Sequence, residues 1–237
     1  MKELFEIVYD ANEYREADMK LAIFDMDGTL IDSLKIWDVF WIEFGKRFLQ
    51  GKEFNPSKED RDFVKTCMLK EGMERIHNHY KIGKDANELV EVIREIAREF
   101  YGNTVELKVG VKEFLECCSE KGITMCVLSA TEPALVDIAL NHCDIKKYFS
   151  EVFSCVTLGK GKEEPELFLD VCKYFGVNVS DAWMFEDAAL ALETARAVGL
   201  KTVGVYEQYR ENQDVVKAAS TVYVSENETM MKLVDYI

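Results

Sequence analysis

Apolar residues recur along this chain with two different periods, one typical of helices and the other typical of buried strands. Between residues 34 and 104 the spacing is three and four. On a helix this spacing places side chains along one stripe, which then packs against neighbouring helices. The clearest case is the aromatic run Trp37, Phe40, Trp41, Phe44 and Phe48. Residues 34–104, which we call the helical segment, are therefore predicted to form an all-helical bundle.

Helix start signals divide the helical segment into four predicted helices. A polar side chain just before an apolar period accepts a hydrogen bond from the exposed N–H groups of the first turn. Such signals occur at Ser33, at Ser57 and at Asp85 with Glu88, and the remaining helix covers residues 72–80. The helix that opens at Ser57 is predicted to include Met68.

Outside the helical segment, short apolar runs alternate with helical stretches. Several runs are continuous, as expected for strands buried on both faces of a parallel sheet. They cover residues 20–25, 123–129, 151–156, 182–187, 201–206 and 221–225, and most are separated by predicted helices at 110–122, 132–143, 165–177 and 190–200. This order predicts an α/β fold, a doubly wound, mainly parallel Rossmann-like sheet from residues 1–33 and 105–237. The helical segment would be inserted after the first strand.

The charge of the chain limits its partners. Its 237 residues include 29 Lys and Arg and 44 Asp and Glu, which gives a formal net charge of −15. This charge repels nucleic acid and anionic membranes, so neither is an expected partner. No stretch approaches the roughly 20 apolar residues of a membrane span, and the acidic N-terminus is unlike a signal peptide. We expect a cytoplasmic protein, and the sequence does not predict its oligomeric state.

The cysteines and histidines indicate no metal or disulfide framework. Seven cysteines, an odd number, occur without a C-x-x-C pair, which favours free, reduced thiols and disfavours zinc. His77 and His79 lie two residues apart, so they face different sides of a helix and are interpreted as polar helix surface.

Polar side chains follow the predicted strands at their carboxyl ends, where ligands collect in α/β sheets. Asp25 and Asp27 follow the first strand, and residues two apart on extended backbone point to the same side. Ser129 ends the second strand, beside a predicted helix start whose N–H groups suit phosphate. Glu186 and Asp187 end the fourth strand.

The third strand leads into a turn that contains Lys160 and Lys162. Taken alone, each of these acids, hydroxyls and lysines is most often a helix cap or solvated surface. Their joint position at successive strand ends predicts one site instead.

Four carboxylates around one point favour a hard cation with oxygen ligands, and Mg²⁺ is the expected cofactor, with Asp25, Asp27, Glu186 and Asp187 as candidate ligands. An ionised Asp25 can then attack phosphorus and form an aspartyl phosphate. Asp27, beside the leaving oxygen, can donate a proton to it and later accept one from water. A lysine and Mg²⁺ would neutralise the charge.

The motif "DMDGTLIDS" resembles the first motif of the haloacid dehalogenase superfamily. Ser129, the "GKxxP" turn and the "FED" pair resemble its other three motifs, in the same order. The resemblance implies that Asp25 is the nucleophile, Asp27 the acid/base, and Ser129 and Lys162 the phosphate-binding residues. It also implies that Asp25, the Asp27 carbonyl and Asp187 bind Mg²⁺, with Glu186 acting directly or through water. The helical segment resembles the cap of this family, which closes over small substrates.

Three residues depart from the family pattern. Glu163 replaces the first proline of the usual GKPxP turn, and Lys160 is close enough to compete with Lys162 for the phosphate-binding role. Ala188 stands where a serine commonly follows the acid pair.

The expected function is hydrolysis of a small phosphorylated metabolite, such as a sugar phosphate or phosphoglycolate. Asp27 argues against a dehalogenase, because halide leaves without a proton. A β-phosphoglucomutase is the alternative, although Trp37 stands where that enzyme carries a histidine. A non-catalytic Mg²⁺- and phosphate-binding protein, or a receiver domain that accepts phosphate, is a weaker alternative. Candidate substrate-selecting side chains are Lys65, Lys70, Arg75, His77 and Lys84.

Overall fold

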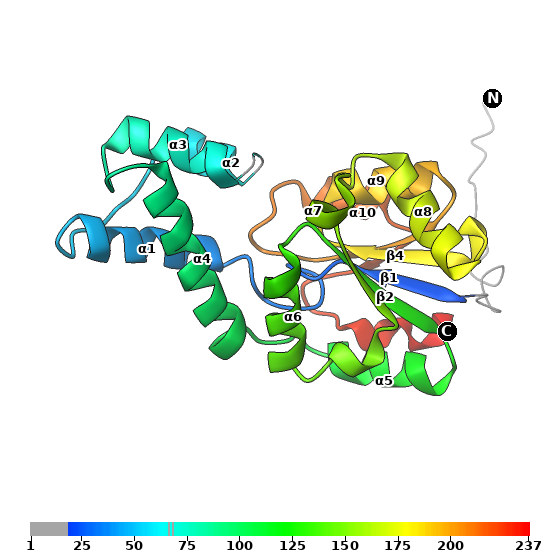
Figure 1. Cartoon of the computed structure of the whole chain (residues 1–237). Helices are drawn as coiled ribbons and strands as arrows, with labels where there is room; N and C mark the ends of the chain where they lie inside the picture. The colour runs from blue at the N-terminus through cyan, green and yellow to red at the C-terminus, as the bar shows by residue number, and fades with distance from the viewer. Residues whose placement is uncertain (1–18, 66, 68) are drawn as a thin grey trace, which may run out of the picture.

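The computed structural model describes residues 19–65, 67 and 69–237. Its described part contains a parallel sheet of six strands (Figure 1). The strands are β1 Leu21–Phe24, β2 Thr124–Ser129, β3 Glu151–Ser154, β4 Ala182–Glu186, β5 Lys201–Val205 and β6 Val222–Val224. Their order is β3-β2-β1-β4-β5-β6, and every neighbouring pair is parallel. The predicted α/β fold with a parallel, Rossmann-like sheet is confirmed.

Both faces of the sheet are covered by helices, which explains the continuous apolar runs. Leu21 and Ile23 of β1 point to the face covered by α8 (Pro165–Phe175) and α9 (Ala189–Ala197). Ala22 and Phe24 point to the face covered by α5 (Val111–Glu120) and α6 (Pro133–His142). Because successive side chains alternate between the faces, a strand buried on both sides must be apolar at every position.

The described residues outside the helical segment, 19–33 and 105–237, are called the sheet region, and its remaining elements are short. They are η1 (Lys146–Tyr148), α7 (Cys155–Leu158), η2 (Val179–Asp181), α10 (Gln213–Ala219) and η3 (Met230–Tyr236). The prediction of a strand over residues 151–156 was wrong at its end, where α7 begins. The partner strand β2 ends at Ser129, opposite Ser154, so Cys155 has no neighbour with which to continue the ladder.

The helical segment contains α1 (Ile36–Phe48), α2 (Lys58–Val64), α3 (Leu69–Tyr80) and α4 (Ala86–Asn103), which lie together beside the sheet region (Figure 1). The aromatic stripe of α1 is buried at Phe40, Trp41 and Phe44, as its spacing predicts. Helix α4 packs against α1, α3 and also α6, so it joins the segment to the rest of the molecule. The division at residues 33/34 and 104/105 stays a prediction.

The predicted helix starts have different outcomes. Ser57 caps α2 by accepting from Asp60 N, and the Asp85 side chain caps α4 by accepting from Glu88 N. The prediction that Ser33 caps α1 was wrong. The helix begins at Ile36 without a side-chain cap, because the Ser33 hydroxyl is used elsewhere, as described below. Met68 lies outside the described residues.

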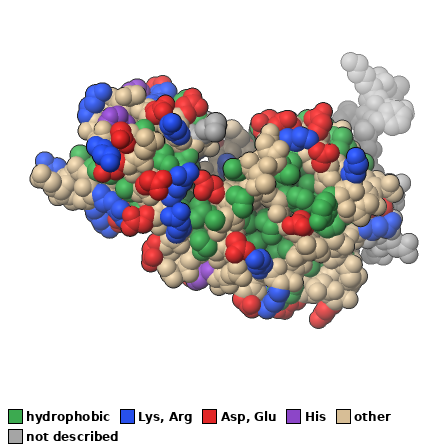
Figure 2. All heavy atoms as spheres, viewed as in Figure 1, with side chains coloured by type: hydrophobic (Ala, Val, Ile, Leu, Met, Phe, Trp, Pro, Cys, Tyr) green, Lys and Arg blue, Asp and Glu red, His purple; other side chains and the backbone are tan. Residues whose placement is uncertain are grey.

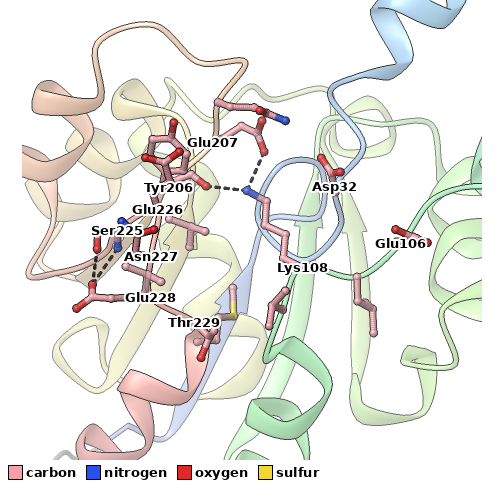
Figure 3. Close-up of a pocket in the computed structure, with 16 residues that line it drawn as sticks. Asp32, Glu106, Lys108, Tyr206, Glu207, Ser225, Glu226, Asn227, Glu228 and Thr229 are labelled. Atoms are coloured by element: carbon pink, nitrogen blue, oxygen red, sulfur yellow. Dashed lines mark hydrogen bonds and ion pairs between the residues drawn. The ribbon is translucent and has the colours of Figure 1, made fainter.

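Two passages of chain connect the helical segment to the sheet, and they are bonded to each other. Ile31 and Leu107 form an antiparallel bridge, and Asp32 N donates to the Glu106 carbonyl at 2.9 Å. Lys108 anchors the second passage, because its Nζ lies 2.7 Å from both the Tyr206 carbonyl and Glu207 Oε2 (Figure 3).

A cavity of about 560 Å³ lies beside these connections (Figure 3). Asp32, Glu106 and Lys108 form one wall, and the chain after β5 and residues 224–230 form the other. All of its lining residues lie outside the site predicted from the sequence. No helix among the described residues is long and apolar enough to cross a membrane.

Candidate active site

The acid cluster, Asp25, Glu186 and Asp187, forms where β1 and β4 end side by side. Phe24 pairs with Phe185, and Asp25 N donates to the Phe185 carbonyl at 2.9 Å, which sets Asp25 beside Glu186. One carboxylate oxygen from each of the three acids lies within 4.8 Å of the others, and all three residues are buried. The structure therefore brings together acids that are about 160 residues apart in the chain.

Gly28 allows the turn after β1 to approach this cluster. Its φ is +86°, in the left-handed region that favours glycine. A Cβ at this position would lie 2.6 Å from Asp187 Oδ2, closer than atoms can approach. The glycine of the "DMDGT" motif is thus required by both backbone conformation and space.

Lys162 is the cation of the acid cluster. Its Nζ is bonded to Asp25 Oδ1 and lies 2.7 Å from Glu186 Oε2. Lys160, the other candidate, pairs instead with Asp170 at 2.5 Å on the surface. The geometry places Lys162, rather than Lys160, at the predicted site.

Burial and the repulsion between neighbouring carboxylates shift the pKa values of the acid cluster. Desolvation, reinforced by the charge of Glu186 and opposed by Lys162, raises the pKa of Asp25 to about 7. Burial and Glu186 likewise raise the pKa of Asp187 well above its usual range. Burial would also raise the pKa of Glu186, but Lys162 and hydrogen bonds from Asp187 and from the backbone N–H of Ala188 outweigh it and lower that pKa.

Asp27 lies beside this cluster in a cradle of three hydroxyl groups, which we call the hydroxyl cradle. Ser33 Oγ and Tyr101 OH each donate to Asp27 Oδ1 at 2.7 Å. Thr131 Oγ1 donates to Asp27 Oδ2, also at 2.7 Å. Burial and Asp27 raise the pKa of Tyr101 well above its usual range, so this hydroxyl stays a donor at neutral pH.

Ser129 ends β2 and is fully buried. Its Oγ accepts a hydrogen bond from Thr131 N at 3.0 Å, which tightens the turn between β2 and α6. The Thr131 carbonyl in turn accepts from Ser154 Oγ at 2.9 Å, at the end of β3. These bonds fix the ends of β2 and β3 relative to Asp27, and the predicted contact of Ser129 with phosphate stays a prediction.

Arg210 enters the site from the chain after β5. Its Nε lies 2.6 Å from Asp187 Oδ2, while its own side chain remains 40% exposed. The other oxygen, Asp187 Oδ1, is buried and has no hydrogen-bond partner in the described part of the chain. Three buried carboxylates, one of them with an unpaired oxygen, are the donor set that a hard cation prefers, so the residues present fit Mg²⁺.

The sequence profile of the haloacid dehalogenase-like hydrolases matches residues 22–205, which is most of the chain and includes every residue of the acid cluster. This chain belongs to that family. The predicted superfamily and its hydrolase class are thereby confirmed.

Individual relatives of this haloacid dehalogenase-like hydrolase are distant, and the matches cover most of both chains. A phosphorylated carbohydrates phosphatase of Thermotoga maritima is 22% identical, covering 90% of this chain and 97% of that protein. A phosphoglycolate phosphatase of Pseudomonas fluorescens is 24% identical, covering 87% and 76%. The names of both relatives agree with the predicted enzyme class, a phosphatase.

A crystal structure described as a putative beta-phosphoglucomutase from Thermotoga maritima shares the fold. It superimposes with a TM-score of 0.74 at 22% identity, covering 87% of this chain and 94% of that one. At this identity the likeness concerns the fold alone.

Sequence reasoning missed four residues of this hydrolase's site: Ser33, Tyr101, Thr131 and Arg210. Thr131 carried a signal, because it follows Ser129 by two residues at the same strand end. Ser33 was assigned to a helix cap instead. Tyr101 and Arg210 gave no local signal, since each reaches its partner only through the folded arrangement of α4 or of the chain after β5.

The candidate substrate-selecting side chains of the helical segment include two with internal partners. Arg75 pairs with Asp60 at 2.5 Å and with Glu59 at 2.7 Å. His77 Nδ1 lies 2.9 Å from the Ile82 carbonyl, and His79 Nδ1 lies 3.1 Å from Asp60 Oδ1. These contacts are compatible with the interpretation of both histidines as polar helix surface, because His79 is 50% exposed and His77 is half-buried. Figure 2 shows charges of both signs mixed over this segment, as on an ordinary solvated surface.

Proposed function

We propose that this protein is a Mg²⁺-dependent phosphatase that hydrolyses a small phosphate monoester through an aspartyl-phosphate intermediate. The observation that carries the proposal is the separation of two aspartates with different surroundings. Asp25 lies in the acid cluster beside Lys162, whereas Asp27 lies in the hydroxyl cradle. The Lys162 ammonium group beside Asp25 suits a nucleophile that attacks a negatively charged phosphate. The three hydroxyl groups around Asp27 suit a carboxyl group that is held in place to exchange a proton.

In the first half-reaction a carboxylate oxygen of Asp25 attacks phosphorus, and the bond from phosphorus to the ester oxygen breaks. Asp27 gives its proton to that departing oxygen. In the second half-reaction Asp27 takes a proton from water while the water oxygen bonds to phosphorus. The bond from phosphorus to the Asp25 oxygen breaks, which restores Asp25 and releases inorganic phosphate. Lys162 and Ser129 hold the oxygens of the phosphoryl group, and the Lys162 ammonium offsets their negative charge.

Asp25, the Asp27 carbonyl and Asp187 are the residues that would hold Mg²⁺, with Glu186 bound directly or through water. The ion would supply positive charge that keeps Asp25 ionised and screens the phosphoryl oxygens. The helical segment would act as a cap, because α4 connects it to the site at Tyr101.

The substrate class rests on relatives whose names specify phosphorylated carbohydrates and phosphoglycolate. We propose a phosphorylated sugar or a phosphorylated hydroxy acid of similar size. Two assignments stay predictions, namely the cytoplasmic location and the absence of nucleic-acid and membrane partners.

The decisive experiment is a screen of small phosphate esters, including an aryl phosphate, with Mg²⁺ and with EDTA. We expect phosphate release with Mg²⁺ and a loss of at least about 10²-fold with EDTA, because several kcal/mol of charge stabilisation would be removed. Asp25→Asn should abolish both turnover and labelling of the protein by substrate phosphate. Turnover that survives chelation, or an active Asp25→Asn enzyme, would defeat the proposal.

The alternatives have their own outcomes in this screen. Isomerisation of a hexose 1-phosphate, primed by a sugar bisphosphate and much faster than hydrolysis, would favour the mutase. Binding of Mg²⁺ and phosphate without turnover of any ester would favour the non-catalytic binding protein, and phosphorylation that persists without turnover would favour the receiver.

A further inference from the structure

The hydroxyl cradle distributes its donors unevenly over the two oxygens of Asp27. Oδ1 accepts from both Ser33 Oγ and Tyr101 OH, at 2.7 Å each. Among the described residues, Oδ2 accepts from Thr131 Oγ1 alone, at 2.7 Å. A carboxylate oxygen has two lone pairs, so Oδ1 is saturated and Oδ2 retains one free position.

We propose that Tyr101 is a positioning residue that saturates Oδ1 of Asp27 and so assigns the exchange of the catalytic proton to Oδ2. The inference rests on the proposed function, because it concerns how Asp27 serves the phosphatase reaction. The proton leaves Oδ2 for the ester oxygen as the bond to phosphorus breaks. In the second half-reaction Oδ2 takes a proton from the attacking water, which restores the starting state.

The origin of Tyr101 makes this role specific. Ser33 and Thr131 belong to the chain next to the strand ends, whereas Tyr101 lies on α4, 74 residues from Asp27, and is 5% exposed. Among the described residues of the helical segment, Tyr101 is the one that hydrogen-bonds the acid/base. With Tyr101 in place, the proton-exchanging oxygen is selected only when the end of α4 is packed against the sheet region.

The end of α4 is held firmly, which keeps the Tyr101 hydroxyl at one place. Thr104 N and Val105 N both bond to the Phe100 carbonyl, at 2.9 and 3.0 Å. In the chain that follows, the Glu106 carbonyl accepts a hydrogen bond from Asp32 N. The Lys108 ammonium group is bonded to the Tyr206 carbonyl and to the Glu207 carboxylate (Figure 3). A hydroxyl on so restrained a backbone loses little additional freedom when it orients Asp27.

The test compares leaving groups, because only a poor leaving group needs the proton of Asp27. Tyr101→Phe removes the hydroxyl and keeps the buried ring. The value of kcat/KM, which reports steps up to release of the alcohol, should fall about ten-fold for an alkyl phosphate, a part of the usual contribution of general acid catalysis. For 2,4-dinitrophenyl phosphate, whose leaving group departs unprotonated, it should change less than about two-fold.

Two further variants complete the experiment. Ser33→Ala removes the other donor to Oδ1 and should show the same dependence on the leaving group, so the idea can be tested even if Tyr101→Phe folds poorly. Tyr174→Phe is the matched control, because its hydroxyl donates to Glu151 at 2.9 Å on the exposed surface, and it should match the wild type with both esters.

Equal losses with both esters would show a merely structural role for Tyr101 and overturn the assignment, and so would an unchanged enzyme. Either result with an active wild type leaves the proposed function standing. A wild type that hydrolyses neither ester would overturn the proposed function, and the assignment with it.

Discussion

The surroundings of Asp60 and the acid cluster are two regions that bury carboxylates, and they compensate the charge in opposite ways. Asp60, in the helical segment, is 4% exposed and is surrounded by donors. Its carboxylate accepts hydrogen bonds from the side chains of Ser57, Arg75 and Tyr80, and His79 Nδ1 lies beside it. The acid cluster of the sheet region contains three buried carboxylates, with Lys162 and Arg210 as their cations and one oxygen of Asp187 unpaired.

The ionisation of the two regions follows this difference. Burial would raise the pKa of Asp60, but the hydrogen bonds from Tyr80, Arg75, His79 and Ser57 outweigh it and hold the pKa well below its usual range. In the acid cluster burial prevails at Asp25 and Asp187, whose pKa values rise, whereas Lys162 lowers the pKa of Glu186. Breaking the pairing of a fully paired buried acid destabilises a fold, whereas an underpaired group of buried acids is a candidate ligand site.

The comparison is tested most severely by removing the cation of the acid cluster. Lys162→Ala should lower kcat/KM by about 10²- to 10³-fold, because the transferring phosphoryl group loses a preorganised positive charge. The matched control is Lys160→Ala, whose ammonium group pairs with Asp170 on the surface, and we expect less than a two-fold change there. Steady-state kinetics with one ester decides between them. Activity that survives Lys162→Ala and is lost in Lys160→Ala would reverse the assignment.

The second prediction concerns the saturated acid. Asp60→Asn should leave phosphatase activity within a few-fold and lower the free energy of unfolding at pH 7 by about 2 kcal/mol, the usual cost of removing hydrogen bonds to a charged group. Urea unfolding measures this difference. Glu74→Gln, at an exposed position of α3, is the control and should change stability by less than about 0.5 kcal/mol.

The pH dependence of this difference has a definite sign. The pKa of Asp60 is lower in the folded than in the unfolded protein, so its ionisation stabilises the fold above the unfolded value of about 3.9. That contribution is lost as the pH falls through the folded value. The difference in the free energy of unfolding between the wild type and Asp60→Asn should therefore be largest at neutral pH and should shrink in acid. A gap that widens in acid would contradict the pairing described here.

The sequence predicted what depends on local pattern and missed what depends on distant packing. Asp25 and Asp27 could be located because they follow a continuous apolar run that is typical of a buried strand. Glu186 and Asp187 could be located for the same reason. Ser33 was misassigned because a serine before an apolar helix is usually a cap, and nothing local shows that its hydroxyl is taken by Asp27. Arg75 looks like a solvated helix residue until α2 brings Asp60 to it.

The smallest expected effect concerns Arg210, which pairs with one oxygen of Asp187 and leaves the other oxygen unpaired. Its guanidinium group holds Asp187 Oδ2 at 2.6 Å, so a divalent ion must share this carboxylate or displace the arginine. Arg210→Gln should therefore tighten the binding of Mg²⁺ by roughly three- to ten-fold, a modest effect because the arginine is partly exposed and its charge is screened. Calorimetric titration of the metal-free protein measures this affinity without turnover.

Arg196→Gln is the control for Arg210, since its guanidinium group bonds the Ala218 carbonyl on the surface, and its affinity for Mg²⁺ should equal that of the wild type. Weaker binding in Arg210→Gln would show that the arginine helps to hold Asp187 in place for the ion rather than competing with it. The acid cluster would then resemble Asp60 in having each acid positioned by its own cation. In that case the contrast between the two regions would rest on the unpaired Asp187 Oδ1 alone.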